Sequence, residues 1–171
     1  MNDLKAEKIF RPKKDANINS IEPSLSQDKN ELINNEQNAK LLRLAEYENN
    51  PELIKEIIQA GAEINTFDES GATALHISTH YANNDVVAIL IELKANLNDK
   101  DQQGNTALHY AVITKNKVAA EALIAVGANP NIKNNDNQTA LKIAQKRNDH
   151  KMLKILLPTI IHKVKFYYKK T

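Results

Sequence analysis

The sequence predicts an all-α repeat solenoid, and three observations support this prediction. The segment 68–76 returns at 101–109 and again, with changes, at 134–142, so the chain repeats every 33 residues. Each period holds two short stretches in which apolar residues recur at helical spacing. Four glycines and five prolines are too few for the many turns of a strand-rich sandwich.

The N-terminal segment, residues 1–35, lacks a sustained apolar period and contains Pro12 and Pro23, each of which interrupts a helix. Such a stretch buries too little apolar surface to offset the entropy lost on ordering. We therefore expect a disordered polar tail, with room for a short helix near residues 28–33.

The repeat units follow at about 35–67, 68–100, 101–133 and 134–157. In the second unit, Thr73 is placed to cap the first helix through its hydroxyl. Gly61 and Gly127 end the second helix of their units, because glycine adopts the left-handed conformation without a Cβ clash. Lys94 stands at the same position, so we expect an altered or slightly strained helix end there.

These residues resemble the ankyrin repeat. The signature Thr-x-Leu-His occurs as Thr73-Ala-Leu-His76 and Thr106-Ala-Leu-His109, and the terminal Gly-Ala-Asn-x-Asn occurs at 127–131. Alanine stands where the family usually has proline, and the first and fourth units lack the full signature, as terminal repeats often do.

The resemblance implies that residues 36–157 form an ankyrin-repeat domain of about four helix-turn-helix units with projecting β-turn or hairpin loops. These loops fall at about 66–70, 99–103 and 133–136. It further implies a non-enzymatic protein–protein interaction module, such as an adaptor, scaffold or inhibitor. A partner protein would bind the loop tips and the concave face of the first helices.

The sequence gives little support for a metal site, a cofactor site or a catalytic site. The chain has no cysteine, which excludes disulfides and thiolate metal sites. His76 and His80 have metal-ligand spacing, but no carboxylate or cysteine completes a ligand set. By the resemblance, His76 and His109 bear hydrogen bonds between adjacent turns. No catalytic triad or phosphate-binding loop is recognisable, so we expect no metal, no cofactor and no enzyme activity.

The expected binding residues vary between units while the repeat frame stays constant, and they fall on the tips and on the inner face of the first helices. They are Tyr47, Phe67, Glu69, His80, Tyr81, Gln102, Gln103, Ile113, Thr114, Asp136, Lys146 and Arg147. Aromatic residues are typical binding hot spots, although each one alone fits a plain packing role equally well. Replacing Tyr81 and Ile113 by alanine is expected to weaken partner binding and to leave the melting temperature nearly unchanged.

The C-terminal segment, residues 158–171, is basic and carries several aromatic residues. Residues 36–141 hold eight basic and fourteen acidic residues, whereas residues 142–171 hold nine basic and one acidic residue. The segment is either a cap on the open end of the stack or an arm for an electrostatic partner. The alternative function is therefore attachment to nucleic acid or an anionic membrane through this segment.

Location and assembly are only weakly encoded. No stretch approaches the ~20 apolar residues of a membrane-spanning helix. The N-terminus mixes acids and bases without an apolar block, unlike a Sec-type signal peptide. We expect a monomer that is cytoplasmic, or that is exported into another cell by a different route.

Overall fold

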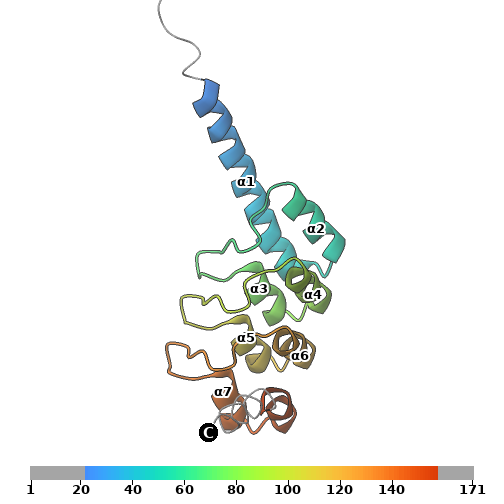
Figure 1. Ribbon diagram of the computed structural model, residues 1–171, viewed down its shortest axis with the longest axis vertical. Helices are drawn as coiled ribbons and strands as arrows, with labels where there is room; N and C mark the ends of the chain where they lie inside the picture. Colours follow the sequence, from blue (N-terminus) through green and yellow to red (C-terminus); the bar gives the residue numbers. More distant parts are fainter. Residues whose placement is uncertain (1–21, 158–171) are drawn as a thin grey trace, which may run out of the picture. The chain divides into compact units, whose positions relative to one another are not determined.

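The computed structural model describes residues 22–157, with side chains from residue 31 onward. Within this range the chain forms helices joined by turns (Figure 1). The helices are α1 (Glu22–Tyr47), α2 (Pro51–Gln59), α3 (Ala74–His80), α4 (Asn84–Glu92), α5 (Ala107–Ile113), α6 (Lys117–Ala125), α7 (Ala140–Lys146) and a last helix described over residues 150–157. No helix in this range is long and apolar enough to cross a bilayer.

Helix α1 corrects part of the expected tail, because it begins at Glu22 and takes residues 22–35 into a helix. Pro23 lies in its first turn, where proline is tolerated because the first N–H groups of a helix have no intrahelical acceptor. Apolar periodicity does not predict a helix over residues 22–35, because these residues are mostly polar. The chain divides into compact units at 1–32 and 33–171, and all contacts below belong to the second. The rest of the expected tail, residues 1–21, lies outside the described residues.

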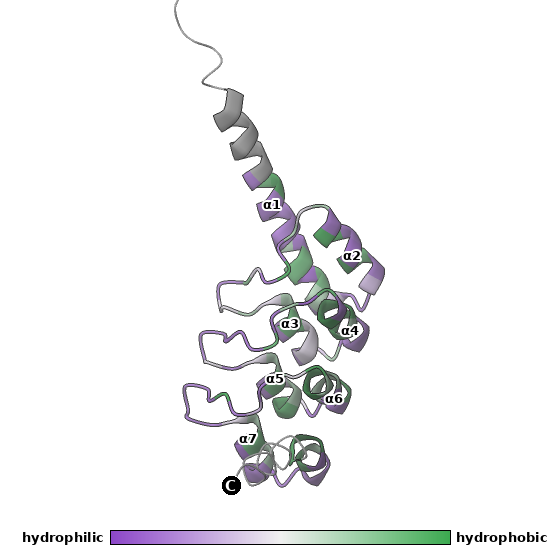
Figure 2. Ribbon diagram, viewed as in Figure 1, coloured by the Kyte–Doolittle hydropathy of each residue, from purple (hydrophilic) through white to green (hydrophobic). Residues whose placement is uncertain are grey.

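Helix pairs form two layers in the second unit. The first helices α3, α5 and α7 contact one another in sequence, as do the second helices α2, α4 and α6. Colouring by hydropathy shows green, apolar parts on α4 and α6 together with purple parts, and mostly purple, hydrophilic loops that project on the side of α3 and α5 (Figure 2). The buried core is aliphatic apart from Met152, and its largest side chains include Leu75, Leu108 and Leu123. The all-α repeat solenoid predicted from the 33-residue period is thus confirmed.

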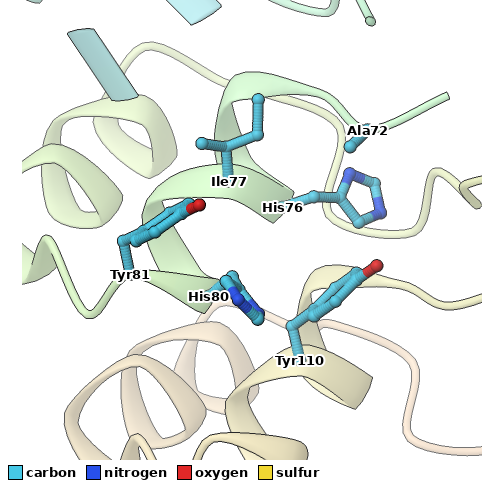
Figure 3. A pocket seen from close by; sticks show the side chains of 6 residues that line it. All are labelled: Ala72, His76, Ile77, His80, Tyr81 and Tyr110. Atoms are coloured by element: carbon cyan, nitrogen blue, oxygen red, sulfur yellow. The ribbon is translucent and has the colours of Figure 1, made fainter. Parts of the chain in front are cut away.

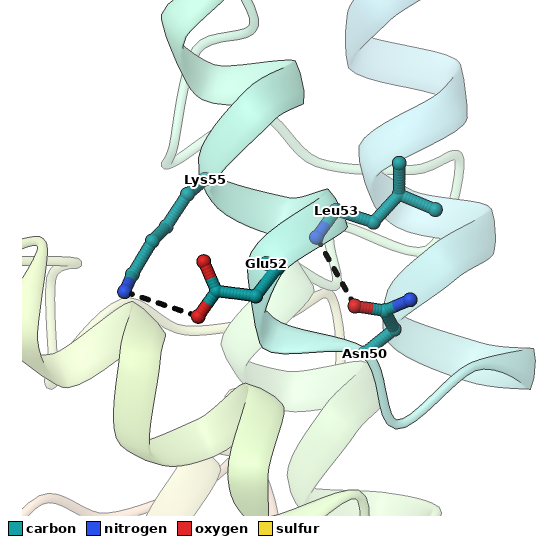
Figure 4. A network of polar contacts seen from close by, with 4 residues as sticks. All are labelled: Asn50, Glu52, Leu53 and Lys55. Atoms are coloured by element: carbon teal, nitrogen blue, oxygen red, sulfur yellow. Dashed lines mark hydrogen bonds and ion pairs between the residues drawn. The ribbon is translucent and has the colours of Figure 1, made fainter.

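The start of α2 shows how the sequence fixes a helix boundary (Figure 4). The side-chain oxygen of Asn50 accepts a hydrogen bond from the N–H of Leu53 at 3.2 Å, and Pro51 occupies the first helical position. Both features are typical of helix N-termini. An ion pair of 3.4 Å between Lys55 Nζ and Glu52 Oε1 adds little, because both side chains reach solvent.

The second helices end in the same way in three successive units. Gly61 and Gly127 have φ angles of 108° and 96°, and Lys94 has a φ of 67°. The N–H of Lys94 donates to the carbonyl of Ile91, and the N–H of Ala95 donates to that of Leu90. This is a Schellman motif. The helix end at Lys94 is therefore not altered in its hydrogen bonds; what distinguishes it is a lysine in the left-handed conformation that glycine adopts at the other two ends.

The connecting loops form turns at the three expected tips. In the first tip an isolated antiparallel bridge pairs Phe67 with Thr73. Successive tips are joined by backbone hydrogen bonds, from Gln102 N–H to the Ser70 carbonyl and from Asn135 N–H to the Gln103 carbonyl, each at 2.9 Å. The tips thus share one edge of the stack and hold their side chains in a fixed register.

Candidate functional site

The signature histidines, His76 and His109, form hydrogen bonds that join one repeat unit to the next. The Nδ1 atom of His76 accepts a hydrogen bond from the backbone N–H of Thr73 at 3.1 Å, so the ring proton lies on Nε2. Nε2 then donates to the carbonyl oxygens of Asp99 at 3.0 Å and Asn105 at 3.2 Å, which belong to the next tip. Both ring nitrogens of this buried side chain are therefore engaged, which leaves neither available to a metal.

His109 repeats this arrangement one unit later. Its Nδ1 accepts from the N–H of Thr106 at 3.1 Å and its Nε2 donates to the Gln138 carbonyl at 3.1 Å. Burial lowers the pKa of both His76 and His109 below the ordinary value, because the charged imidazolium loses its hydration. In the described part of the chain, no three histidine, cysteine or acidic side chains gather into a group that could hold a metal.

The expected binding residues lie on the tips and on the ends of the first helices. All are exposed except Ile113 and Thr114, which are half-buried. Tyr47 is 75% exposed at the end of α1, Tyr81 is 52% exposed just after α3, and Phe67 is 69% exposed on the first tip. Large apolar rings in water are costly, so these three positions are the strongest candidates for contact with a partner.

Four of the expected binding residues also serve the frame. Ile113 is half-buried and packs against the core, so its replacement by alanine is now expected to lower stability. The Thr114 hydroxyl donates to the Tyr110 carbonyl at 2.9 Å, and Arg147 donates to the carbonyl of Ile113. The side-chain amide of Gln102 donates to the Glu69 carbonyl of the preceding tip at 2.6 Å. The Arg147 and Gln102 bonds join neighbouring units, whereas the Thr114 bond stays within its own unit.

A small pocket opens on the inner face between α3 and α5 (Figure 3). We call it the inner-face pocket, and it has a volume of about 150 Å³. Its lining residues are Ala72, His76, Ile77, His80, Tyr81 and Tyr110. It brings together two of the expected binding residues, His80 and Tyr81.

Hydrogen bonds to carboxylates hold both tyrosines of the pocket. The hydroxyl of Tyr81 donates to Glu46 Oε1 at 2.9 Å, and that of Tyr110 donates to Asp101 Oδ2 at 2.6 Å. The bond to Glu46 raises the pKa of Tyr81. Burial, with the bond to Asp101, raises the pKa of Tyr110 well above its ordinary value. Both phenols therefore stay protonated, with their rings fixed at the pocket wall.

Tyr110 lines the pocket but is not among the binding residues expected from the sequence. A signal was present, because the equivalent positions in the other units are Leu44, Ile77 and Ile143, all aliphatic. A single tyrosine in an aliphatic column indicates a polar requirement, and here the requirement is the hydrogen bond to Asp101. Asp101 is itself buried and also accepts from the N–H of Asn105 at 2.8 Å.

A second groove lies on the outer helices, between α6 and the helix at 150–157. Lys117, Lys151 and Lys154 line it together with Glu121, around a floor that includes Ile155. Its lysines give this end of the stack a basic surface. The expected basic segment 158–171 lies outside the described residues.

Comparison with known proteins agrees with the repeat geometry. A family model described as ankyrin repeats (3 copies) matches residues 41–134, which is more than half of the chain. The match covers the units that carry the complete signature and part of the first unit, and it leaves out the last helix pair. A search of curated proteins found no match.

Proposed function

The chain belongs to the ankyrin repeat family, and we propose that it acts as a non-enzymatic adaptor, scaffold or inhibitor that binds a partner protein. Ankyrin repeats are in general protein–protein interaction modules. In this chain we assign the contact to the tips and the inner face of the first helices. We also propose that the unbound protein is a monomer.

The exposed aromatic side chains carry this proposal. Tyr47 and Phe67 of the first unit and Tyr81 of the second present large apolar surfaces to solvent. Aromatic residues of this kind dominate binding energy at protein interfaces. The rigid frame of tips and histidines holds them in place, so little conformational entropy is lost when a partner binds.

The proposal is tested by comparing two variants of the full chain in affinity capture from cell extract. The inner-face variant replaces Tyr47, Phe67 and Tyr81 by serine. The control variant replaces Val118 and Val126, which are 58% and 50% exposed on and beside α6, by serine. Circular dichroism and melting check that both variants fold.

The expected result is a protein that wild type and control variant recover in equal amounts and that the inner-face variant loses. Each hot-spot aromatic is worth about 2 kcal/mol or more, so the triple replacement should weaken binding more than about 100-fold. Equal recovery by all three proteins, or loss only with the control variant, would overturn the assignment to the inner face.

The basic groove favours a second candidate function, electrostatic attachment to nucleic acid or an anionic membrane. Lys117, Lys151 and Lys154 concentrate positive charge in this groove, and the basic segment 158–171 follows them in the sequence. Binding of this kind falls steeply with salt, because each contact releases a condensed counterion. The measurement is affinity for a DNA duplex and for phosphatidylserine vesicles at 50 and 200 mM salt, and unmeasurable binding to both at the lower salt would exclude this function.

A further inference from the structure

Three aromatic rings from two neighbouring units form walls of the inner-face pocket. The His80 ring centroid lies 5.0 Å from that of Tyr81 and 5.5 Å from that of Tyr110, with interplanar angles of 82° and 89°. The Tyr110 ring also lies edge-on to His76, at 6.0 Å and 86°. The rings thus pack edge-to-face on one another, and Figure 3 shows them around the opening together with the other lining residues. Aromatic rings arranged around a space are suited to bind a cationic group.

The two charged groups that are hydrogen-bonded to these rings are carboxylates. Glu46 accepts the hydrogen bond of Tyr81, and Asp101 accepts that of Tyr110. No lysine or arginine occurs among the described residues that line the pocket. A phenol that donates to a carboxylate carries more electron density on its ring, which strengthens the attraction between ring and cation. The carboxylates therefore favour a positive guest and disfavour an anion.

The pocket is small and open to solvent, and its size suits one side chain. A cavity of about 150 Å³ holds a group the size of benzene. Ala72 and Ile77 supply an apolar part of the lining, beside the rings and their carboxylates. This combination suits a long side chain with an aliphatic stem and a charged end.

We infer that the inner-face pocket receives a cationic side chain, a lysine ammonium or an arginine guanidinium, from the partner protein. The inference rests on the proposed function, because it names the chemistry by which the inner face recognises its partner. His80, Tyr81 and Tyr110 contact the cation, while Glu46 and Asp101 act on it through the tyrosines and through their charge.

The experiment uses peptides selected from a random library displayed on phage, with the full chain as bait. Each selected peptide is synthesised in two forms. One form has the selected sequence, and in the other the lysine is replaced by neutral norleucine or the arginine by neutral citrulline. Dissociation constants are measured by calorimetry for wild type and for Tyr81→Leu. Removal of the charge should weaken binding to wild type by about 5- to 30-fold, the range expected for a cation on aromatic faces. The same change should weaken binding to Tyr81→Leu by a clearly smaller factor, because one of the three rings that contact the cation is lost while His80, Tyr110 and the carboxylates remain.

Two further variants separate the pocket from exposed aromatic surface in general. Tyr81→Phe keeps the ring and loses only the bond to Glu46, so it should retain most of the discrimination between charged and neutral peptide. Tyr47→Leu removes an exposed tyrosine that does not line the pocket, so its discrimination should equal that of wild type. Circular dichroism confirms that each variant is folded before its constants are compared.

The outcomes distinguish this inference from the function on which it rests. Selected peptides that contain no lysine or arginine, or an equal charge effect in wild type and Tyr81→Leu, overturn the cationic guest and leave the binding function standing. Failure to select any peptide above background counts against binding of linear segments by the inner face and overturns the inference with it. A charge effect that is reduced in Tyr81→Leu and unchanged in Tyr47→Leu supports both the cationic guest and the binding function.

Discussion

Lys94 offers a direct test of how the helix ends determine stability. Its φ of 67° lies in the left-handed region, which costs an L-amino acid roughly 1–2 kcal/mol. Glycine adopts this conformation without that cost, although it loses about 0.5–1 kcal/mol more than other residues through the entropy of the unfolded chain. The substitution Lys94→Gly should therefore stabilise the protein by about 0.5–1 kcal/mol.

The reciprocal substitution provides the matched control. Gly127 occupies the same position one unit later, with a φ of 96°, and a Cβ placed there would meet no atom within 4 Å. Gly127→Lys thus adds only backbone strain and no steric clash, and it should destabilise by about the same 0.5–1 kcal/mol. Lys94 is exposed and makes no side-chain hydrogen bond or ion pair that the structure shows, so its removal introduces no second effect of similar size.

Urea unfolding followed by circular dichroism measures both variants. In a thermal melt, a change of 1 kcal/mol corresponds to roughly 2–4 °C in melting temperature for a chain of this length. The midpoint should rise for Lys94→Gly and fall for Gly127→Lys, with the slope of the transition unchanged. If Lys94→Gly destabilises the protein, the left-handed lysine is not strained and the reasoning is refuted.

Three more predictions follow from buried or half-buried groups. Because burial lowers the pKa of His76 and His109, the unfolded chain binds protons more readily, so the unfolding free energy should fall as pH is lowered from 7.5 to 5.5. Its slope should reach at most about 1.4 kcal/mol per pH unit for each histidine, and a flat profile would contradict the neutral tautomers. The buried Thr79 hydroxyl has no hydrogen-bond partner among the described residues, and the equivalent residue is Val112, so Thr79→Val should raise the unfolding free energy by about 1 kcal/mol in the same urea assay. Ile113→Ala should lower the unfolding free energy by about 1–2 kcal/mol, because the Ile113 side chain packs on the core. An unchanged midpoint of urea unfolding would mean that Ile113 serves only the binding surface.

The repeat frame could be predicted from the sequence because its signals are local and periodic. The fixed spacing between Thr73 and His76 places a ring nitrogen beside the backbone N–H of the same turn. Lys94 could be assigned a strained helix end because Gly61 and Gly127 stand in the same register. Each signal recurs at the 33-residue offset, so one unit confirms the next.

The candidate pocket could not be predicted in the same way. It depends on rings from two units whose relative orientation no single repeat encodes. Tyr110 lies on the column of Ile77, where periodicity predicts a core aliphatic residue. The helical part of residues 22–35 was also missed, because a helix with few apolar residues leaves no 3.6-residue pattern.

The frame also explains which positions remain free to choose a partner. The ring nitrogens of His76 and His109 are engaged in hydrogen bonds of the stack. The residue four positions later lies on the same face of the helix, where it is exposed at His80 and half-buried at Ile113. In successive units this column reads Tyr47, His80, Ile113 and Lys146. This column is aromatic and lies near carboxylates at α1 and α3, and it is cationic at α7. The two ends of the inner face therefore differ in charge. A segment that places a cation in the inner-face pocket therefore gains most when its acidic residues lie toward α7, and the reversed segment meets like charges at both ends.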